Sequence, residues 1–396
     1  MPIPSPFHER TQELCSSYRW KDWAGYYAVS SYDTTHDREY FAFRESAGLL
    51  DVSPLYKYEV TGVDAAAMLS RMLSRDVARL AVGRVAYACW CDDRGKIVDD
   101  GTVARLGEDH YRLTAADPTF HWLSAAARGY RVRLEDSSAR LAAVAVQGPT
   151  SREVLRAASD ADLDALRFFR VVRARVDGLE VWISRTGYTG DLGYEVWVER
   201  DGALRLWDAL VAAGRPWGLT PAGLDALDVA RIEAGFVMLG VDYYSAPKVV
   251  LESRKSTPLE LGLAWTVELD RGEFVGRSAL LEERARGSAW SLVGLEVAWD
   301  ELEALYAGHG LPPSLPATAR RDPLPVYLDG HQVGRATSHT WSPLLKRYLA
   351  LASVRAAHAA PGTRLELEHT VEFERSTVPA RVVATPFFDP ERKRRP

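Results

Sequence analysis

The chain has 396 residues, of which 47% are apolar and 26% are charged, and its formal net charge at pH 7 is −5. This composition is typical of globular proteins, and a length of about 150 residues per domain predicts two or three domains. The weak negative charge excludes a general attraction to nucleic acid or to anionic membranes, so neither is expected as a partner. No signal pattern begins the chain and no apolar run approaches the ~18 residues of a membrane span, which favours a cytoplasmic protein.

The cysteines, Cys15, Cys89 and Cys91, are too few and odd in number for a disulfide framework. Cys89 and Cys91 are expected on one face of a strand as small apolar core residues, because no second cysteine or histidine pair completes a metal site. The nine histidines are scattered along the chain. We therefore predict no metal.

The first elements predicted along the chain lie between residues 56 and 106. Residues 56–62 read as a strand that runs into a turn, and residues 63–80 read as a helix with one apolar stripe. Residues 84–106 read as a hairpin that turns at Asp93-Arg94-Gly95. Within this hairpin, Asp99 and Asp100 stand between apolar residues, where strand alternation sends one inward and one outward.

The middle of the chain mixes helices and strands. A capping box at 150–153 predicts the start of a helix, and Asp177-Gly178 predicts the turn of a hairpin over 173–184. Further helices are predicted from Asp201 to Gly214 and from Thr220-Pro221 to Gly235. Without a regular alternation of strand and helix, this pattern favours the α+β class over a doubly wound sheet.

The C-terminal part is rich in short strands. Residues 308–323 are rich in proline and alanine and read as a surface loop. The final ~100 residues, dense in short alternating strands, predict a small barrel or sandwich. The basic tail, ERKRRP, reads most simply as a solvated end.

Residues 185–195, RTGYTGDLGYE, form the most unusual stretch. Three glycines surround Tyr188, and a strand that contains Glu195 follows, so the dinucleotide-binding pattern does not fit. The glycines permit close backbone approach, the tyrosine ring can pack on a flat ligand, and a carboxylate can grip adjacent N–H donors. Further on, Arg231 lies three residues after Asp228 on a predicted helix, where a surface ion pair is the simpler interpretation.

Six stretches stand out as motifs: FRESAGLLDVS, GKIVDDGTV, AVQGP, ISRTGYTGDLGYE, ARIEAGFVMLG and VGRATSHTWSP. They occur in the order seen in the glycine-cleavage T-protein (aminomethyltransferase) family, which the chain resembles from about Trp20 to its C-terminal strands. The family includes folate-dependent demethylases and the folate-binding domains of sarcosine and dimethylglycine dehydrogenases. The TGYTG…GYE element is its most specific mark.

This resemblance implies three domains in a cloverleaf around a central hole that holds tetrahydrofolate, a cosubstrate. Residues 1–53 and 137–245 would form a discontinuous first domain and residues 54–136 the second. Residues 246–396 would supply a linker and a C-terminal, barrel-like β-rich domain.

The resemblance also implies roles for five residues. Glu195 would hold the donor edge of the pterin ring, with Tyr188 packed in the same pocket. Asp99 matches the family's catalytic carboxylate near the reacting folate nitrogen, and Tyr87 matches a folate-contacting tyrosine. Arg231 matches the arginine of the family's RLEAG motif, at or near the site.

Three positions depart from the family's aminomethyltransferases. Those enzymes carry an arginine where Leu227 stands, an asparagine where Ala116 stands and a histidine where Pro54 stands. In the family these positions lie around the ligand, so the resemblance implies a retained folate skeleton with a changed donor side. A paralogue that acts on another one-carbon donor is favoured over a true T-protein.

The preferred hypothesis is an enzyme that moves a methyl group from a small O-, N- or S-methylated donor to N5 of tetrahydrofolate. One alternative is aminomethyl transfer, for which a lipoyl carrier protein would be the partner. An alternative of another class is a non-catalytic folate-binding protein, like the iron–sulfur assembly branch of the family. The K-G-C-Y-x-G-Q-E signature of that branch has no match here. An aromatic or cationic donor would suit the aromatic residues expected near the cleft, most of which core packing also explains: Trp23, Tyr26, Tyr27, Tyr56, Trp90, Phe236, Tyr243 and Tyr244.

Overall fold

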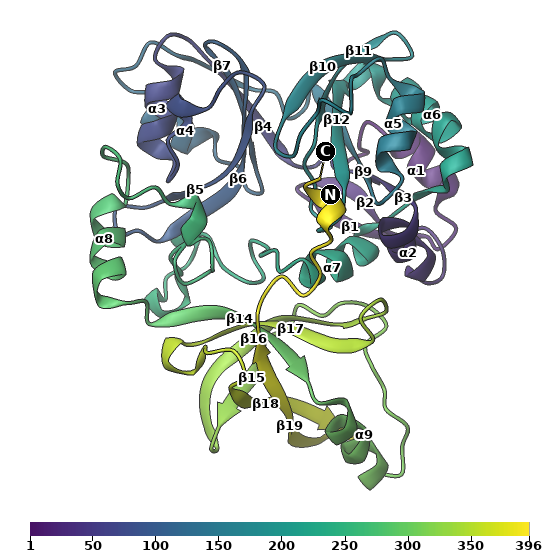
Figure 1. Cartoon of the computed structure of the whole chain (residues 1–396), viewed down its shortest axis with the longest axis vertical. Coiled ribbons are helices and arrows are strands. Elements are labelled where there is room, and N and C mark those ends of the chain that lie inside the picture. Colours follow the sequence, from purple (N-terminus) through teal and green to yellow (C-terminus); the bar gives the residue numbers. More distant parts are fainter. Residues whose placement is uncertain (396) are drawn as a thin grey trace.

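A computed structural model describes residues 1–395 and shows three bodies, two side by side and one below them (Figure 1). The upper bodies are built on a six-stranded and a five-stranded sheet, and the lower one is a closed barrel. The N-terminal segment adds three elements: α1 (His8–Leu14), β1 (Arg19–Trp23) and β2 (Tyr26–Ser31). Among the described residues, no helix combines the length and apolar character that a membrane crossing needs.

The six-stranded sheet has the order β10-β11-β12-β9-β3-β13, in which only the β3–β13 pair is parallel. All seven residues of β9 are buried, because helices cover both faces of the sheet. Helices α5 (Ser151–Ala158) and α6 (Ala203–Gly214) pack on one face, and α2 (Asp37–Glu45) and α7 (Leu224–Glu233) pack on the other. The strands are β3 (Ala47–Asp51), β9 (Leu141–Gln147), β10 (Val171–Val176), β11 (Leu179–Ser184), β12 (Gly193–Glu199) and β13 (Leu219–Pro221).

The five-stranded sheet has the order β5-β6-β7-β4-β8. Helices α3 (Ala65–Met72) and α4 (Phe120–Ala126) cover one of its faces. The other face is turned toward the six-stranded sheet, where Trp182 packs with Val85 and the Arg112 guanidinium lies 5.7 Å from the Trp197 ring. The strands are β4 (Tyr56–Thr61), β5 (Val85–Cys91), β6 (Ile97–Gly107), β7 (His110–Ala115) and β8 (Arg133–Asp136).

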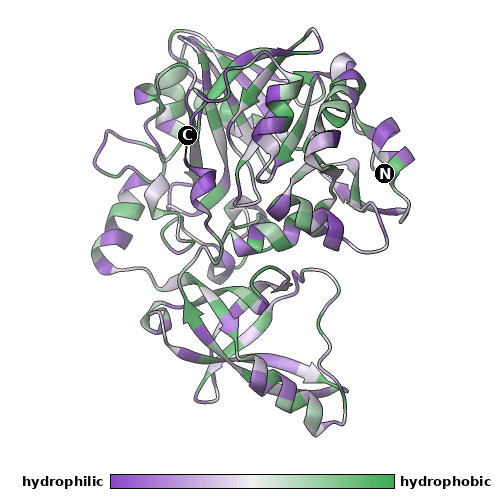
Figure 2. Cartoon of the chain, turned by 45° about the vertical axis from the view of Figure 1, so that its right-hand side comes forward, coloured by the Kyte–Doolittle hydropathy of each residue, from purple (hydrophilic) through white to green (hydrophobic). Residues whose placement is uncertain are grey.

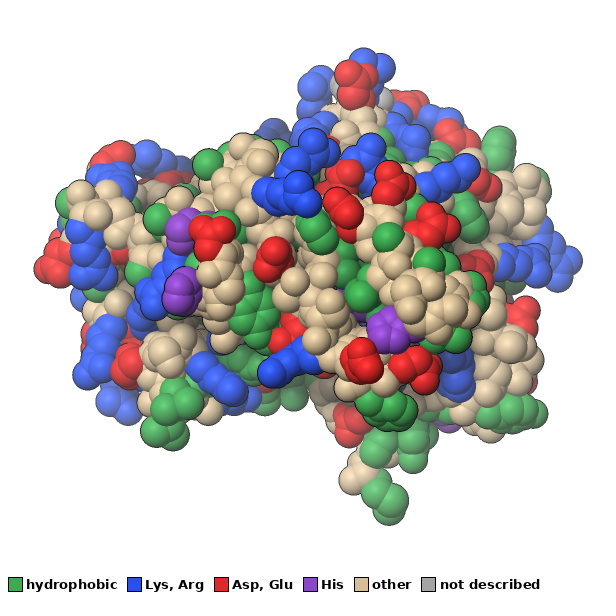
Figure 3. Space-filling model, turned by 90° about the horizontal axis from the view of Figure 1, so that it is seen from below, with side chains coloured by type: hydrophobic (Ala, Val, Ile, Leu, Met, Phe, Trp, Pro, Cys, Tyr) green, Lys and Arg blue, Asp and Glu red, His purple; other side chains and the backbone are tan. Residues whose placement is uncertain are grey.

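The barrel closes in the order β14-β17-β16-β15-β18-β19 and is reached through α8 (Arg277–Arg286). Its strands carry hydrophobic and hydrophilic residues along their length (Figure 2), and the apolar ones form one core. Seen from below, basic and acidic side chains are intermixed on the surface (Figure 3). The remaining elements are β14 (Trp290–Val297), α9 (Trp299–Gly308), β15 (Leu324–Leu328), β16 (His331–Ser342), β17 (Arg347–Arg355), β18 (Arg364–Val371) and β19 (Glu374–Val383).

Both predicted hairpins are confirmed. β5 and β6 are joined through Gly95, whose φ is +72°, and β10 and β11 are joined through Asp177 and Gly178, at φ +47° and +76°. Two consecutive positive φ angles are what a type I′ turn needs, which explains the Asp-Gly pair. Cys89 and Cys91 are free and buried, which confirms the core interpretation.

Two predicted helices have the wrong extent. The helix over 63–80 ends at Met72, because Leu73 leaves it to form a bridge with Trp90 at the edge of β5. The helix expected from Thr220 begins at Leu224, because the preceding residues pair with β3 as the strand β13. In both cases a nearby strand edge competes for backbone hydrogen bonds that the local pattern assigned to a helix.

The capping box at 150–153 predicts the start of α5 correctly but not its cap. Thr150 is the residue before the helix, yet its hydroxyl donates to the Trp217 carbonyl at 2.9 Å and makes no capping bond. A threonine hydroxyl at this position can bond either to the backbone of the following helix or to a distant carbonyl. Here it bonds to the chain after α6 and leaves the helix without a side-chain cap.

The interpretation of the basic tail as a solvated end is wrong. After the barrel, the chain returns upward to the two upper bodies (Figure 1) and ends in a turn at Glu391–Lys393. Lys393 is 9% exposed, and Arg392 forms an ion pair with the buried Asp191. Charged side chains alone did not predict this, because the partner carboxylate lies about 200 residues earlier in the chain.

Candidate functional site

The candidate site lies where the two sheets face one another. Tyr87 and Asp100 come from the five-stranded sheet, and Tyr188 and Glu195 come from the six-stranded body. Burial raises the pKa of each of these four groups, and yet each side chain retains intermediate exposure to solvent. These four groups are therefore partly desolvated by their surroundings and still accessible to water.

The two aspartates of β6 point to opposite faces, which confirms the alternation expected from the sequence. Asp100 shares its face with Tyr87 and Cys89, and its carboxylate accepts hydrogen bonds from the hydroxyls of Tyr87 and Tyr243. Burial raises the pKa of Asp100, and the two tyrosine hydroxyls partly oppose that rise. The carboxylate is thereby held in one orientation from both sides.

Asp99 occupies the opposite face and is 1% exposed. Its two oxygens accept the backbone N–H groups of Asp100, at 2.8 Å, and of Asp117, at 3.0 Å. Burial, and after it the neighbouring charge of Asp100, raises the pKa of Asp99. The carboxylate that shares a face with Tyr87 is thus one residue later than the one assigned from the sequence.

The bare backbone of the glycine turn, residues 185–195, serves the protein itself. The Gln147 side chain passes between Gly187 and Gly193, where an added Cβ would lie 1.9 Å and 2.1 Å from its Oε1 atom. At Gly190, where φ is +78°, a Cβ would lie 2.6 Å from the Cβ of Ala234. Packing within the protein therefore accounts for the three glycines, and close approach of a ligand to this backbone stays a prediction.

The glycine turn carries Tyr188 near its start and Glu195 at its end. The Thr186 hydroxyl donates to Glu195 Oε2 at 2.8 Å and orients the carboxylate. The Tyr188 ring stacks on Phe236 with centroids 5.4 Å apart, and its hydroxyl donates to the Val237 carbonyl. An oriented carboxylate next to an aromatic stack fits a flat ligand that has N–H donors along one edge, as a pterin has.

A second aromatic pair lies at β5, the edge strand of the five-stranded sheet. Tyr87 stacks on Trp265 with centroids 5.6 Å apart and an interplanar angle of 19°. Trp265 is 57% exposed, and the Arg75 guanidinium lies 5.7 Å from its ring. Tyr87 therefore connects the half-buried Asp100 to an exposed aromatic ring.

Arg231 lies beneath this region, fully buried, and holds domains together. Its guanidinium donates to Asp228 at 2.8 Å, to Asp242 at 2.7 Å and to the Ser338 hydroxyl of β16 at 2.8 Å. The i,i+3 pair with Asp228 expected from the sequence exists, but it is buried rather than on the surface. These contacts join α7 to the barrel, and a ligand role for Arg231 stays a prediction.

The three positions that depart from the family pattern differ in burial. Leu227 is 7% exposed and belongs to the apolar cluster on which Tyr188 packs. Pro54 is buried, and Ala116 is exposed beside Asp117. Leu227 thus lies in the immediate surroundings of the glycine turn.

Sequence reasoning missed two residues of the site. Tyr243 was noted only among many aromatic residues, and Gln147 only as part of a motif. Their partners, Asp100 and the carbonyls of Thr186 and Tyr194, are between 39 and 143 positions away. No local pattern could reveal either contact.

Comparison with known proteins decides the family. Residues 7–271 match the GCVT N-terminal domain, and residues 313–389 match the glycine cleavage T-protein C-terminal barrel domain. The chain belongs to the glycine-cleavage T-protein family. Enzymes of this family are folate-dependent one-carbon transferases that use tetrahydrofolate as substrate or cosubstrate.

Relatives of this T-protein family member match along most of its length. An aminomethyltransferase of Halothermothrix orenii is 35% identical over 88% of this chain and 90% of its own. An aminomethyltransferase of Streptomyces avermitilis is 37% identical over 93% of both chains. A trimethylamine-oxide aldolase of Ruegeria pomeroyi is 34% identical over 98% of this chain, which spans 47% of that protein.

The fold of this family member is confirmed by a solved structure. The glycine cleavage system aminomethyltransferase T from Bartonella henselae superimposes with a TM-score of 0.83 at 24% identity, over 98% of this chain and 99% of that one. The predicted α+β cloverleaf with a C-terminal barrel is therefore correct. Within residues 1–395, no three His, Cys, Asp or Glu side chains are grouped as metal ligands.

Proposed function

We propose that the protein moves a methyl group from a small O-, N- or S-methylated donor to N5 of tetrahydrofolate. The observation that carries this proposal is the Asp100 carboxylate, held by Tyr87 and Tyr243 on the face of its sheet that is turned toward the six-stranded body, which carries Glu195 and Tyr188. The proposed acid–base group and the proposed pterin-binding groups thereby belong to the two sheets that face one another.

In this proposal each residue has a separate task. Glu195 accepts the N–H donors of the pterin edge, and Tyr188 packs on its flat face. Methyl transfer breaks the bond between the methyl carbon and its O, N or S atom, which keeps the electron pair, while the N5 lone pair forms the new bond to carbon and N5 releases its proton. Asp100 accepts that proton and passes it to the demethylated leaving group. Burial suits it to the task by raising its pKa, since a more basic carboxylate is a better proton acceptor.

The assignment of this step to Asp99 or Asp100 is open to direct test. The sequence resemblance selects Asp99, whereas hydrogen bonds to two backbone N–H groups occupy the Asp99 carboxylate on the other face. We propose Asp100 as the proton acceptor and Asp99 as the residue that fixes the 116–119 loop against β6.

Aminomethyl transfer from a lipoyl carrier protein is the second candidate, and the names of the relatives favour it. The apolar Leu227 in the cluster around Tyr188 supports the first candidate. An apolar side chain at this position suits a small, less polar donor, because no buried polar group is then left without a hydrogen-bond partner. The aldolase among the relatives supports neither candidate directly, since this chain spans 47% of that protein.

The experiment that separates the candidates is single-turnover product analysis with tetrahydrofolate and a panel of small methylated compounds. We expect methyltetrahydrofolate without any carrier protein. Ammonia and methylenetetrahydrofolate that form only with an aminomethyl-lipoyl carrier would replace the proposal with the second candidate. Calorimetric binding of tetrahydrofolate without turnover in either arm would identify a non-catalytic folate-binding protein.

A further inference from the structure

We propose that the C-terminal strap, residues 385–395, is a positioning element that holds the glycine turn and the Tyr188 ring in place. The strap leaves the barrel, crosses the end of α7 and docks against the six-stranded body (Figure 1). Its proposed effect on ligand binding rests on the proposed function, whereas its effect on the order of the turn does not.

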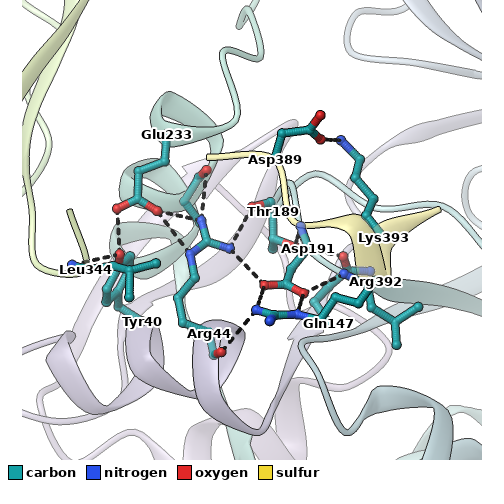
Figure 4. A network of polar contacts seen from close by, with 12 residues as sticks. Tyr40, Arg44, Gln147, Thr189, Asp191, Glu233, Leu344, Asp389, Arg392 and Lys393 are labelled. Carbon is teal, nitrogen blue, oxygen red and sulfur yellow. Dashed lines mark hydrogen bonds and ion pairs between the residues drawn. The ribbon is translucent and has the colours of Figure 1, made fainter. Parts of the chain in front are cut away.

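The strap is anchored in the glycine turn by one ion pair. Arg392 donates from Nε and Nη2 to the two carboxylate oxygens of Asp191, both at 2.7 Å (Figure 4). The Asp191 side chain is fully buried, and Arg44 approaches it to 3.7 Å from the other side. A two-pronged pair to a buried carboxylate fixes orientation as well as position.

Arg185, at the start of the glycine turn, binds backbone carbonyls of the strap. Arg185 is 1% exposed, and its Nη2 atom donates to the carbonyls of Arg392, at 3.3 Å, and Lys393, at 3.2 Å, and also to that of Arg395. Arg185 and Asp191 both belong to residues 185–195, so the strap is held at two points of the segment that carries Tyr188.

Lys393 extends the strap to the aromatic stack. Its ammonium group lies 5.0 Å from the Phe236 ring and 3.7 Å from Asp389, with the side chain almost buried. Phe236 in turn stacks on Tyr188. The Lys393 ammonium group and the stacked Tyr188 ring both restrict the rotation of the Phe236 ring, and Phe236 in turn restrains Tyr188. These contacts link the C-terminus to the proposed pterin pocket.

The root of the strap is equally specific. The N–H groups of Phe387 and Phe388 both donate to the Glu233 carbonyl at 2.9 Å, at the end of α7. The chain passes so close to Gly235 that a Cβ there would lie 3.0 Å from the Cβ of Thr385. Backbone contacts at this end and ion pairs at the other show a fitted segment rather than a loose tail.

The test uses the full-length protein with R392Q and K393M. R394Q is the matched control, because Arg394 is exposed and contacts Asp389 and Glu391 within the strap. Hydrogen exchange of residues 185–195 is measured without ligand, together with the unfolding midpoint. We expect exchange in R392Q and K393M to become faster, relative to R394Q, by more than any change in their unfolding midpoints accounts for, and protection to be restored in K393R. Exchange equal to that of R394Q in both variants would overturn the proposal.

A second measurement, calorimetric titration with tetrahydrofolate, shows whether the order of the turn matters to binding. We expect affinity to fall about 3- to 30-fold in R392Q and K393M and to be unchanged in R394Q. Unchanged affinity in all three variants would remove the positioning role. If the wild type binds no tetrahydrofolate, the proposed function fails, while the exchange data still decide whether the strap orders the turn.

Discussion

The side chain of Gln147 lies so close to Gly187 that a Cβ atom there would stand 1.9 Å from Gln147 Oε1. The same amide donates to the carbonyls of Thr186, at 3.2 Å, and Tyr194, at 3.1 Å, and accepts the Thr189 hydroxyl at 3.0 Å. One buried side chain from β9 thus organises the turn from inside.

Replacing Gly187 with alanine should therefore destabilise the protein and disturb Tyr188 beside it. We expect a loss of about 1–3 kcal/mol in the free energy of unfolding, measured by chemical denaturation. G272A is the matched control, because nothing lies within 4 Å of a Cβ at Gly272. If the clash with Gln147 is the cause, Q147A should destabilise the G187A variant less than it destabilises the wild type. Losses of stability that simply add would contradict this.

Replacing Asp100 with asparagine should lower turnover about 10²-fold or more and change folate affinity little, because the shape stays and the charge goes. Asp99→Asn is the companion variant. The reverse pattern, with turnover lost in D99N and kept in D100N, would restore the assignment made from the sequence.

The pH dependence of turnover checks the same group. Burial raises the pKa of Asp100, so its ionised, proton-accepting form should be lost at a higher pH than for an ordinary aspartate near 3.9. We expect kcat/KM to fall as pH decreases through this raised pKa. An acid limb that persists unchanged in D100N would belong to another group.

Replacing Glu195 with alanine should weaken tetrahydrofolate binding by roughly 2–4 kcal/mol, because the N–H donors of the pterin edge lose a charged acceptor. Calorimetry measures the change. Glu199 lies on the same strand but is exposed and pairs with Arg140, so E199A serves as the control. Equal affinities for E195A and E199A would refute the assignment.

Replacing Arg231 with methionine should cost about 3–5 kcal/mol of stability, because Asp228 and Asp242 would remain buried and lose their shared cation. Denaturation of R284Q, which breaks a surface pair at 3.4 Å, should show less than about 1 kcal/mol. Normal stability with lost folate affinity would instead support the ligand role that the sequence resemblance implies.

The barrel should weaken in mild acid through His339. Burial lowers the pKa of this histidine to about 4, and its Nδ1 atom lies 2.6 Å from the Tyr348 hydroxyl. In the unfolded chain it would titrate near 6.5, so stability present above that pH is lost as pH falls toward 4, by up to about 3 kcal/mol. H339Q should flatten this dependence in denaturation experiments, and the exposed His331, replaced in H331Q, should not.

The local sequence pattern predicted the two hairpin turns, because their formation depends on the residues at the turn itself. The Asp177-Gly178 turn and the turn through Gly95 depend on backbone angles that those residues adopt at little cost, so both hairpins could be read directly. The helix over 63–80 could not, because its second half depends on the edge of β5, which only the folded sheet brings near.

The amino-acid sequence was enough to predict the family, the α+β class, the C-terminal barrel and the placement of Asp99 and Asp100 on opposite faces of a strand. The folded chain was needed to show which aspartate shares a face with Tyr87, which groups surround Arg231, and where the basic tail docks. Alternation along a strand specifies two faces but not which one meets another domain. Likewise, the partners of Arg231 and Arg392 include residues more than 100 positions away, which are close only after the domains have packed.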